Sequence, residues 1–182
     1  MAGKLKIYLS SVFLCGALFI AGCNKGDDTT STKVKCVTCA NGGSCIDDTC
    51  RCLNGWEGSG CLTQTRTKMV GTWTVAEDGS NSAAESYSMF IQTTSATQID
   101  QISFSHIHSI FSVVAIVTKD SVIIPSQTKS GQKIEGSGYY RANGASGDAT
   151  IIMRYAVTNT STGVVNDFGY FSPSSGSSVW TR

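Results

Sequence analysis

The sequence predicts a mostly β protein, made of a small disulfide-rich module followed by an antiparallel β domain. Three observations support this fold class. Six of the eight cysteines lie between Cys36 and Cys61. From Met69 onward, apolar residues alternate with polar ones at a period of two, as in strands with one buried face. No stretch of that region has the 3.6-residue period of an amphipathic helix.

The clustered cysteines follow the spacing C-x2-C-x5-C-x4-C-x-C-x8-C. They are Cys36, Cys39, Cys45, Cys50, Cys52 and Cys61. In an exported chain, an even set of close cysteines predicts a disulfide framework, and sequence alone leaves about 15 pairings open for six cysteines. A zinc site is the alternative for the C-x2-C pair. We disfavour zinc because the chain is exported and the C-x-C end is rich in turn residues.

Two local sequences give this cluster a resemblance to the EGF-like module. Asn41-Gly42-Gly43 is a tight-turn sequence just before Cys45, and residues 50–61 are similar to the C-terminal signature of that family. The resemblance implies three disulfides, Cys36–Cys45, Cys39–Cys50 and Cys52–Cys61. Calcium-binding members carry acidic residues before the first cysteine, whereas residues 33–35 are Lys-Val-Lys. We therefore expect no calcium at that position, and no metal elsewhere.

Residues 1–22 are predicted to be a lipoprotein signal peptide. After Lys4 and Lys6, the apolar run Ile7 to Ile20 has 14 residues, fewer than the ~20 of a membrane-spanning helix. The segment ends in Phe19-Ile20-Ala21-Gly22-Cys23, which resembles the bacterial lipobox and implies that Cys23 carries acyl chains such as palmitate. An ordinary signal peptide is the alternative. The resemblance predicts a protein anchored by lipid in the outer membrane or at the cell surface.

Residues 23–35 are interpreted as the lipidated N-terminus and a flexible tether, because they are polar and lack periodic apolar positions. Asp27-Asp28 resembles the export signal of surface lipoproteins in Bacteroidetes, and a solubilising pair is the alternative. Without Lys4 and Lys6, the chain has 12 basic and 13 acidic residues. This balance predicts no nucleic-acid partner, and firm anchoring then needs more than one acyl chain rather than a basic patch.

The β domain is predicted to span residues 67–182. Ile110 to Val117 is a continuous apolar run that predicts a strand covered on both faces. The following strand is expected to end at Pro125. Eight or nine short strands separated by turn sequences, within about 115 residues, predict an antiparallel barrel, with a sandwich as the alternative.

Gly71-Thr72-Trp73 resembles the G-x-W motif of lipocalin-like (calycin) barrels. The C-terminal half is also similar to lipocalin-like domains of Bacteroidetes lipoproteins, through residues 123–128, 134–138 and 151–155. In the calycin family the tryptophan packs across the closed end of the barrel under a basic residue from the last strand. The resemblance implies that role for Arg182. A barrel of about eight strands either holds one small ligand or is filled by side chains.

The sequence carries no recognisable catalytic motif, and we expect neither enzyme activity nor a cofactor. It has no G-x-S-x-G elbow, no H-E-x-x-H and no glycine-rich phosphate loop. His106 and His108 would share one face of a strand, but two ligands do not complete a zinc site, and we interpret them as strand-end surface residues. Glu135, Asp148 and Asp167 are interpreted as parts of solvated faces and turns.

These observations predict a membrane-anchored, surface-exposed binding or adhesion protein. The alternative is a carrier of a small lipophilic ligand inside the barrel. The expected partners are the membrane, through the lipid anchor, and a protein, a glycan or a small lipophilic ligand. The two functions differ in what fills the barrel. If large inward side chains converge there, little volume remains for a ligand and the carrier alternative is weakened. These side chains are Trp73, Met89, Phe104, Met153 and Tyr155.

Overall fold

The structure, a computed structural model, describes residues 36, 38–144 and 147–182. The predicted signal peptide, the lipidation residue Cys23 and the tether lie outside these residues. Within the described part of the chain, no helical segment has the length and apolar character needed to cross a membrane.

The cysteine-rich module and the residues directly after it contain four short strands in two antiparallel pairs. β1 (Ser44–Ile46) pairs with β2 (Thr49–Arg51), and β3 (Trp56–Glu57) pairs with β4 (Thr63–Gln64). Asp47 and Asp48 join the first pair, and both have positive φ angles, as a two-residue hairpin turn of the primed type requires. Among the described residues of the segment 36–61, only Gly55 and Cys61 are buried.

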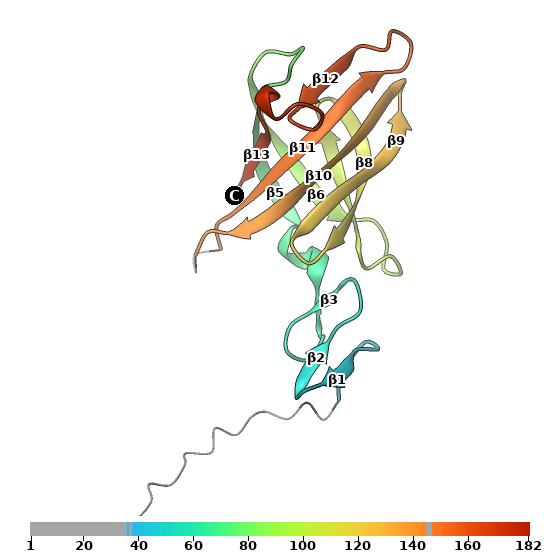
Figure 1. The fold of residues 1–182 in the computed structure, drawn as a ribbon, viewed down its shortest axis with the longest axis vertical. Coiled ribbons are helices and arrows are strands. Elements are labelled where there is room, and N and C mark those ends of the chain that lie inside the picture. Colours follow the sequence, from blue (N-terminus) through green and yellow to red (C-terminus); the bar gives the residue numbers. More distant parts are fainter. Residues whose placement is uncertain (1–35, 37, 145–146) are drawn as a thin grey trace, which may run out of the picture. The chain divides into compact units, whose positions relative to one another are not determined.

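Nine further strands form the second part of the chain. They are β5 (Gly71–Glu77), β6 (Glu85–Thr93), β7 (Gln101–Ile107), β8 (Ile110–Thr118), β9 (Ser121–Lys129), β10 (Gln132–Ala142), β11 (Ala149–Asn159), β12 (Val165–Phe168) and β13 (Ser178–Thr181). From β5 to β11 each strand pairs antiparallel with the next, and β13 pairs with both β11 and β5. These pairings close an eight-stranded antiparallel barrel (Figure 1). The predicted barrel is confirmed, and the sandwich alternative is wrong.

β12 lies outside the closed ring and covers one end of the barrel. It pairs with residues 156–158 of β11, beyond the segment 150–153 that pairs with β13. Hydrogen bonds of 3.0 Å tie it to the β5–β6 loop, from the Ser80 N–H to the Asp167 carbonyl and from the Asp167 N–H to Ser80 Oγ. Phe168, at the end of β12, is fully buried. The end of the barrel next to Glu77 is therefore closed by protein.

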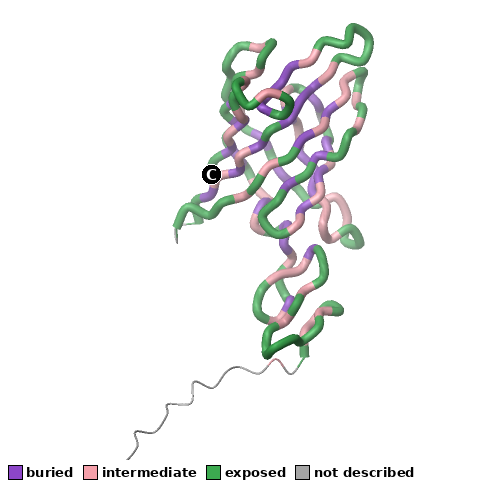
Figure 2. Tube along the Cα trace, in the orientation of Figure 1, coloured by how far each residue is buried: buried purple, intermediate pink, exposed green. Residues whose placement is uncertain are grey.

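Side chains of the barrel strands alternate between the interior and the outside, which gives the buried and exposed bands in Figure 2. The inward side chains form one core that runs from Met69 to Trp180. Gly136 and Gly138 are inward positions of β10 at which a Cβ atom would collide with Tyr155 and Met153 of β11. These two glycines let large side chains of β11 fill the interior at close range.

Two of the strand predictions need correction. β9 continues past Pro125 to Lys129, because Pro125 and Ser126 lie where the β9–β10 register shifts, so the missing proline N–H costs no ladder bond. β8 is covered on one face rather than two. Val113, Ala115 and Val117 are buried, whereas Val114 and Ile116 on the outer face are partly exposed. The outside of a single closed barrel meets solvent, so its strands have only one covered face.

The connector between the module and the barrel is ordered by a buried arginine. Residues Thr65–Lys68 form a short 3-10 helix. Arg66 is only 4% exposed, and its guanidinium donates to the carbonyl oxygens of Ser95, Gln98 and Gln101 at 2.9, 2.7 and 3.2 Å. Lys68 forms ion pairs of 2.8 Å with Glu57 of the module and Asp120 of the barrel. Polar contacts thus link the connector to both parts.

Candidate functional site

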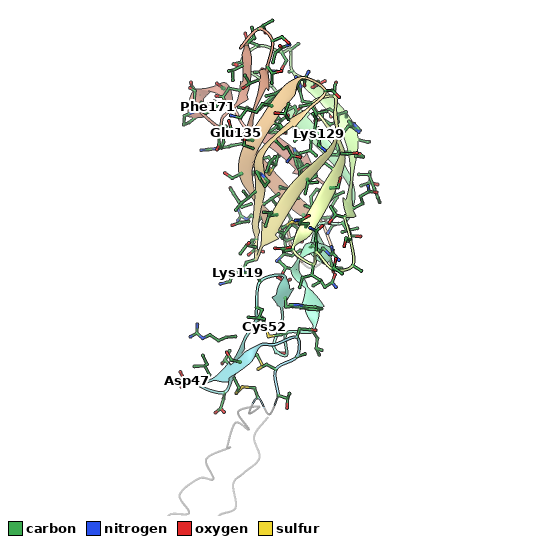
Figure 3. All side chains as sticks on the ribbon, turned by 90° about the vertical axis from the view of Figure 1, so that its right-hand side faces the viewer. Asp47, Cys52, Lys119, Lys129, Glu135 and Phe171 are labelled. Carbon is green, nitrogen blue, oxygen red and sulfur yellow. A yellow bond between two sulfur atoms is a disulfide. The ribbon has the colours of Figure 1, made fainter. Side chains whose placement is uncertain are left out.

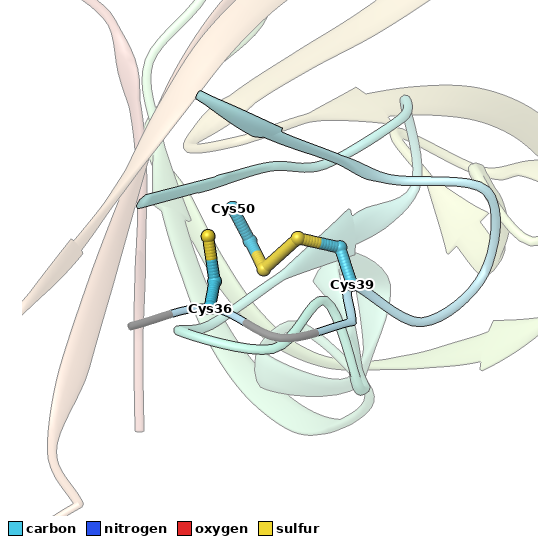
Figure 4. A group of neighbouring side chains, drawn as sticks. All are labelled: Cys36, Cys39 and Cys50. Carbon is cyan, nitrogen blue, oxygen red and sulfur yellow. A yellow bond between two sulfur atoms is a disulfide. The ribbon is translucent and has the colours of Figure 1, made fainter. Parts of the chain in front are cut away.

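All six cysteines of the module lie in disulfides, and the pairs are those that the EGF-like resemblance implies. The Cα atoms are 6.0 Å apart for Cys36–Cys45, 5.7 Å for Cys39–Cys50 and 5.3 Å for Cys52–Cys61. Figure 4 shows the Cys39–Cys50 bridge beside the Cys36 sulfur. Zinc binds thiolates, and sulfurs held in disulfides cannot supply them. The zinc alternative for the C-x2-C pair is therefore incompatible with this structure.

One end of the barrel is closed by the pair that the G-x-W resemblance implies. The Arg182 guanidinium carbon lies 4.6 Å from the centre of the Trp73 ring, within cation–π range. The same guanidinium donates to the Val70 carbonyl at 2.9 Å and to the Lys68 carbonyl. Trp73 Nε1 donates to the Met69 carbonyl at 2.7 Å, so the ring is oriented within the core. Arg182 thereby connects the last strand to the connector.

The interior of the barrel is occupied by the five side chains that distinguish the two predicted functions. Trp73, Met89, Phe104, Met153 and Tyr155 are each 0–1% exposed and belong to the same core. Phe104 also makes an edge contact with Trp180, with ring centres 5.1 Å apart. Protein interiors are packed at about the density of organic crystals, so converging side chains of this size leave little free volume. This geometry weakens the carrier alternative.

Glu77 is a buried carboxylate at the end of the barrel covered by β12. Its side chain is fully buried. One oxygen, Oε2, accepts from the hydroxyls of Tyr155 (2.8 Å) and Ser178, and the other accepts from the Tyr87 hydroxyl at 2.9 Å. Phe168 covers the group by stacking on Tyr155, with ring centres 4.4 Å apart. A buried charge of this kind is tolerated only when hydrogen bonds replace its hydration, as they do here.

The hydrogen bonds decide the protonation of this cluster. Burial alone would raise the pKa of Glu77, but contacts from His108, Ser178, Tyr155 and Tyr87 outweigh it and lower the pKa below its ordinary value. Burial and the neighbouring Glu77 charge raise the pKa of both tyrosines. Glu77 is therefore ionised at neutral pH, and the tyrosines remain neutral donors.

His108 links this cluster to solvent. It lies in the turn between β7 and β8, where its φ of 42° and the φ of 64° at Ser109 fit a two-residue hairpin turn. Its Nδ1 is 3.0 Å from Glu85 Oε1 and 3.7 Å from Glu77 Oε1. Contact with Glu77, opposed by partial burial and assisted by Glu85, raises the pKa of His108.

The neighbouring amide of Asn166 selects one tautomer of His108. Asn166 Oδ1 accepts from the Asn81 N–H at 2.8 Å, so Asn166 Nδ2 points at His108 Nε2, 3.2 Å away. Nε2 must then accept, and the proton of the neutral imidazole lies on Nδ1, facing the carboxylates. Glu77, Glu85 and His108 are close enough together to hold a metal ion. The Nδ1–H tautomer, however, is a donor and not a ligand, so hydrogen bonding describes this group better than metal binding.

The histidines and acids named from the sequence do not form one site. His106 lies in β7, with Nδ1 3.2 Å from Ser105 Oγ, while His108 lies in the following turn, so they do not occupy one strand face as predicted. Both are partly exposed, but His108 also takes part in packing, because it contacts Glu85 and makes an edge contact with the Phe168 ring, with ring centres 5.0 Å apart.

The three acids have separate surroundings. Glu135 accepts from Lys133 at 2.7 Å on the side of the barrel seen in Figure 3, and Asp148 is exposed in a turn, as predicted. Asp167 is buried, which corrects the prediction of a solvated residue. It accepts backbone N–H groups of Tyr170, Phe171 and Ser172 at 2.9–3.0 Å, and these outweigh burial and lower its pKa. Asp167 holds the turn after β12.

Glu77, with its hydroxyl partners, is the group that the sequence analysis missed. One signal was available: Glu77 continues the inward positions of Trp73 and Val75 at a spacing of two. An acid on the buried face of a strand indicates a buried network. Its partners Tyr87, Tyr155 and Ser178 come from three other strands, and only the closed topology brings them together.

Comparison of the chain with protein-family models, with curated proteins and with solved structures found no match.

Proposed function

We propose that the protein is a lipid-anchored, surface-exposed bacterial lipoprotein that acts as a binding or adhesion module, with an EGF-like module and a lipocalin-like barrel displayed beyond the tether. The observation that carries this proposal is the occupied barrel interior, with Trp73, Phe104 and Tyr155 all fully buried. A partner then meets the outside of the barrel or the module. The lipobox resemblance at Cys23 supports the anchor.

The geometry of the buried cluster fits a structural role better than a catalytic one. The Glu77 side chain has no exposure, and both of its oxygens are occupied by hydroxyl donors. The Ser178 hydroxyl is itself buried and accepts from Trp180 Nε1 at 2.7 Å. A nucleophile or base has to reach a substrate atom at hydrogen-bonding distance, and these groups face only protein. We therefore assign the cluster a structural role.

The carrier of a small lipophilic ligand is the second candidate, and it requires a rearranged core. Native mass spectrometry of the full mature chain, purified in mild detergent, separates the two functions. A co-purified small molecule bound stoichiometrically would favour the carrier. The binding proposal predicts a bare polypeptide mass plus its acyl chains.

The anchor and the binding function are tested together in cells that produce the full chain. Metabolic labelling with an acyl probe is expected to mark the wild type and to leave Cys23→Ala unlabelled. Cells with wild-type protein are expected to adhere to a subset of immobilised glycans and matrix proteins, and Cys23→Ala cells are not. Labelling that survives Cys23→Ala contradicts the anchor, and equal adhesion by cells lacking the protein contradicts the binding function.

A further inference from the structure

We propose that the outer face of β9, β10 and β11 binds a carboxylate-bearing sugar unit of a glycan. This inference rests on the proposed binding function and names the chemical class of its ligand. It is carried by a hollow on that face, by the charge within it and by the side-chain groups that line it.

The hollow has a volume of about 680 Å³. Most of its lining residues belong to β9, β10 and β11, which are neighbouring strands of the barrel wall (Figure 1). Its lining residues are Ser121, Ile123, Ser137, Gly138, Tyr139, Ile152, Arg154 and Ser177. The register explains its shape. Tyr139 is paired with Ile152 on one side and Ser121 on the other, and Ser137 is paired with Arg154 and Ile123. Small serines thus alternate with large side chains, and this leaves a depression instead of a smooth surface.

Arg154 is the one charged residue among those that line the hollow. Within the described part of the chain, its guanidinium has no hydrogen bond and no ion pair. Arg154 is paired with Ser137 of β10, and the acid two residues before Ser137 is Glu135. The Glu135 carboxylate already forms an ion pair with Lys133 at 2.7 Å. The guanidinium therefore keeps its planar set of donors available to a carboxylate from outside, which it can bind through two parallel hydrogen bonds.

The other groups of the hollow match a sugar ring better than they match an apolar partner. Tyr139 is 49% exposed and Ile123 is 43% exposed, so a flat apolar surface is present. The side-chain hydroxyls of Ser121, Ser137 and Ser177 make no hydrogen bond with the described residues. A sugar has an apolar ring face and a rim of hydroxyls, which would cover the tyrosine ring and bind the serines at the same time. A purely lipophilic ligand would leave these hydroxyls without partners.

The low net charge of the chain makes this proposal easy to test. The mature chain has 12 basic and 13 acidic residues, so it has no general attraction for polyanions. Binding of an acidic oligosaccharide then reports on a local site. The exposed Arg141, on the same strand as Tyr139 but absent from the lining of the hollow, provides a matched arginine control.

The test is calorimetric titration of the full mature chain, in detergent, with a trimer of galacturonic acid and with the uncharged galactose trimer. We expect the acidic trimer to bind at least tenfold more tightly. Arg154→Gln is expected to abolish this preference, Tyr139→Ala to weaken both trimers about tenfold, and Arg141→Gln to change neither. Because Arg154 and Tyr139 are exposed, the variants should keep the wild-type circular dichroism.

Four outcomes would overturn the inference: absence of binding, equal affinity for the two trimers, wild-type affinity in Arg154→Gln, or displacement of the trimer by equimolar N-acetylglutamate. The last result would indicate an acidic side chain of a protein partner rather than a sugar. If one of these outcomes is found while protein-displaying cells still adhere, only the sugar site is rejected. Loss of adhesion in the cell experiment rejects the proposed function itself.

Discussion

The module and the barrel offset the entropy cost of ordering the chain by different means. The module has three disulfides, and among its described residues only Gly55 and Cys61 are buried. The barrel has no cysteine, and its core continues around the whole ring of strands. The difference shows how the length of a segment determines whether disulfides or a buried core stabilise it. A segment as short as the module cannot bury enough apolar surface, whereas a closed barrel can.

This difference predicts that reduction of the disulfides and loss of buried side chains destabilise different regions. The connector is where this separation could fail, because Arg66 and Lys68 contact the barrel and Lys68 also contacts the module. The Arg66 bonds are buried, but they hold the connector to the barrel only. The ion pair of Lys68 with Glu57 of the module is partly exposed, and such pairs are worth at most about 1 kcal/mol each. We therefore expect unfolding of one region to destabilise the other only slightly through the connector.

Reduction of the disulfides is expected to have the largest effect. Each native disulfide of a small secreted domain contributes about 2–5 kcal/mol, so the module should unfold completely. The barrel should keep its exchange protection, since burial alone holds it. Hydrogen exchange followed by mass spectrometry, on the full mature chain with and without reductant, measures both regions at once.

A thiol count provides the control for this experiment. Without reductant, the unfolded mature chain should contain no free thiol, because Cys23 is predicted to carry lipid and the other six cysteines are paired. One or more free thiols would contradict the pairing. Simultaneous loss of protection in β5–β13 and in the module would show that the two regions form one cooperative unit.

Trp73→Ala is expected to have the next largest effect, confined to the barrel. Removing a fully buried tryptophan costs about 3–5 kcal/mol, through lost burial and the cavity that remains. Chemical denaturation measures the change in the free energy of unfolding of the barrel. Trp56→Ala is the matched control, because Trp56 is only partly buried and lies in the module. An equal loss of barrel stability in both variants would contradict the division of roles.

Glu77→Gln is expected to destabilise the barrel by about 2–3 kcal/mol, since charged hydrogen bonds to Tyr155 and Ser178 become neutral and partly mismatched. Its pH dependence follows from the lowered pKa of Glu77. The contribution is fully present above the unfolded value of about 4.5 and is lost as pH falls through the lower folded value. Denaturation of both proteins between pH 7 and pH 3 should show their difference shrinking below pH 4.5.

Glu85→Gln is the matched control for Glu77→Gln. The Glu85 side chain is 44% exposed, so its loss should change the free energy of unfolding by less than about 1 kcal/mol. If the difference between wild type and Glu77→Gln stays constant down to pH 3, or if Glu85→Gln is equally damaging, the buried charge is not the source of the effect.

Much of the fold could be predicted from the sequence because its signals are local. The alternation around Trp73 or Met153 follows from the strand geometry of each segment. The disulfide pairing was predicted only through the EGF-like resemblance, because the spacing alone leaves many pairings open. The Glu77 cluster could not be predicted as a whole. Tyr87 and Tyr155 read as ordinary inward aromatics, and their distance from Glu77 depends on how β5, β6, β11 and β13 meet around the barrel. Asp167 read as a surface acid because its donors belong to a turn with no clear sequence signal.

Arg182→Ala is expected to have the smallest effect and to locate the boundary between the two regions. The guanidinium stacks over Trp73 and donates to the carbonyls of Val70 and Lys68, so its loss should cost about 1–2 kcal/mol. Arg182→Lys keeps the charge over the ring but cannot form both carbonyl bonds from a planar fork, so it should recover only part of the stability.

Because the carbonyl acceptors belong to the connector, hydrogen exchange in Arg182→Ala should rise in residues 65–71 and stay unchanged in residues 38–61. A rise that extends through the disulfide-bonded module would mean that the last strand of the barrel also stabilises the module, and the two regions would then have to be treated as coupled.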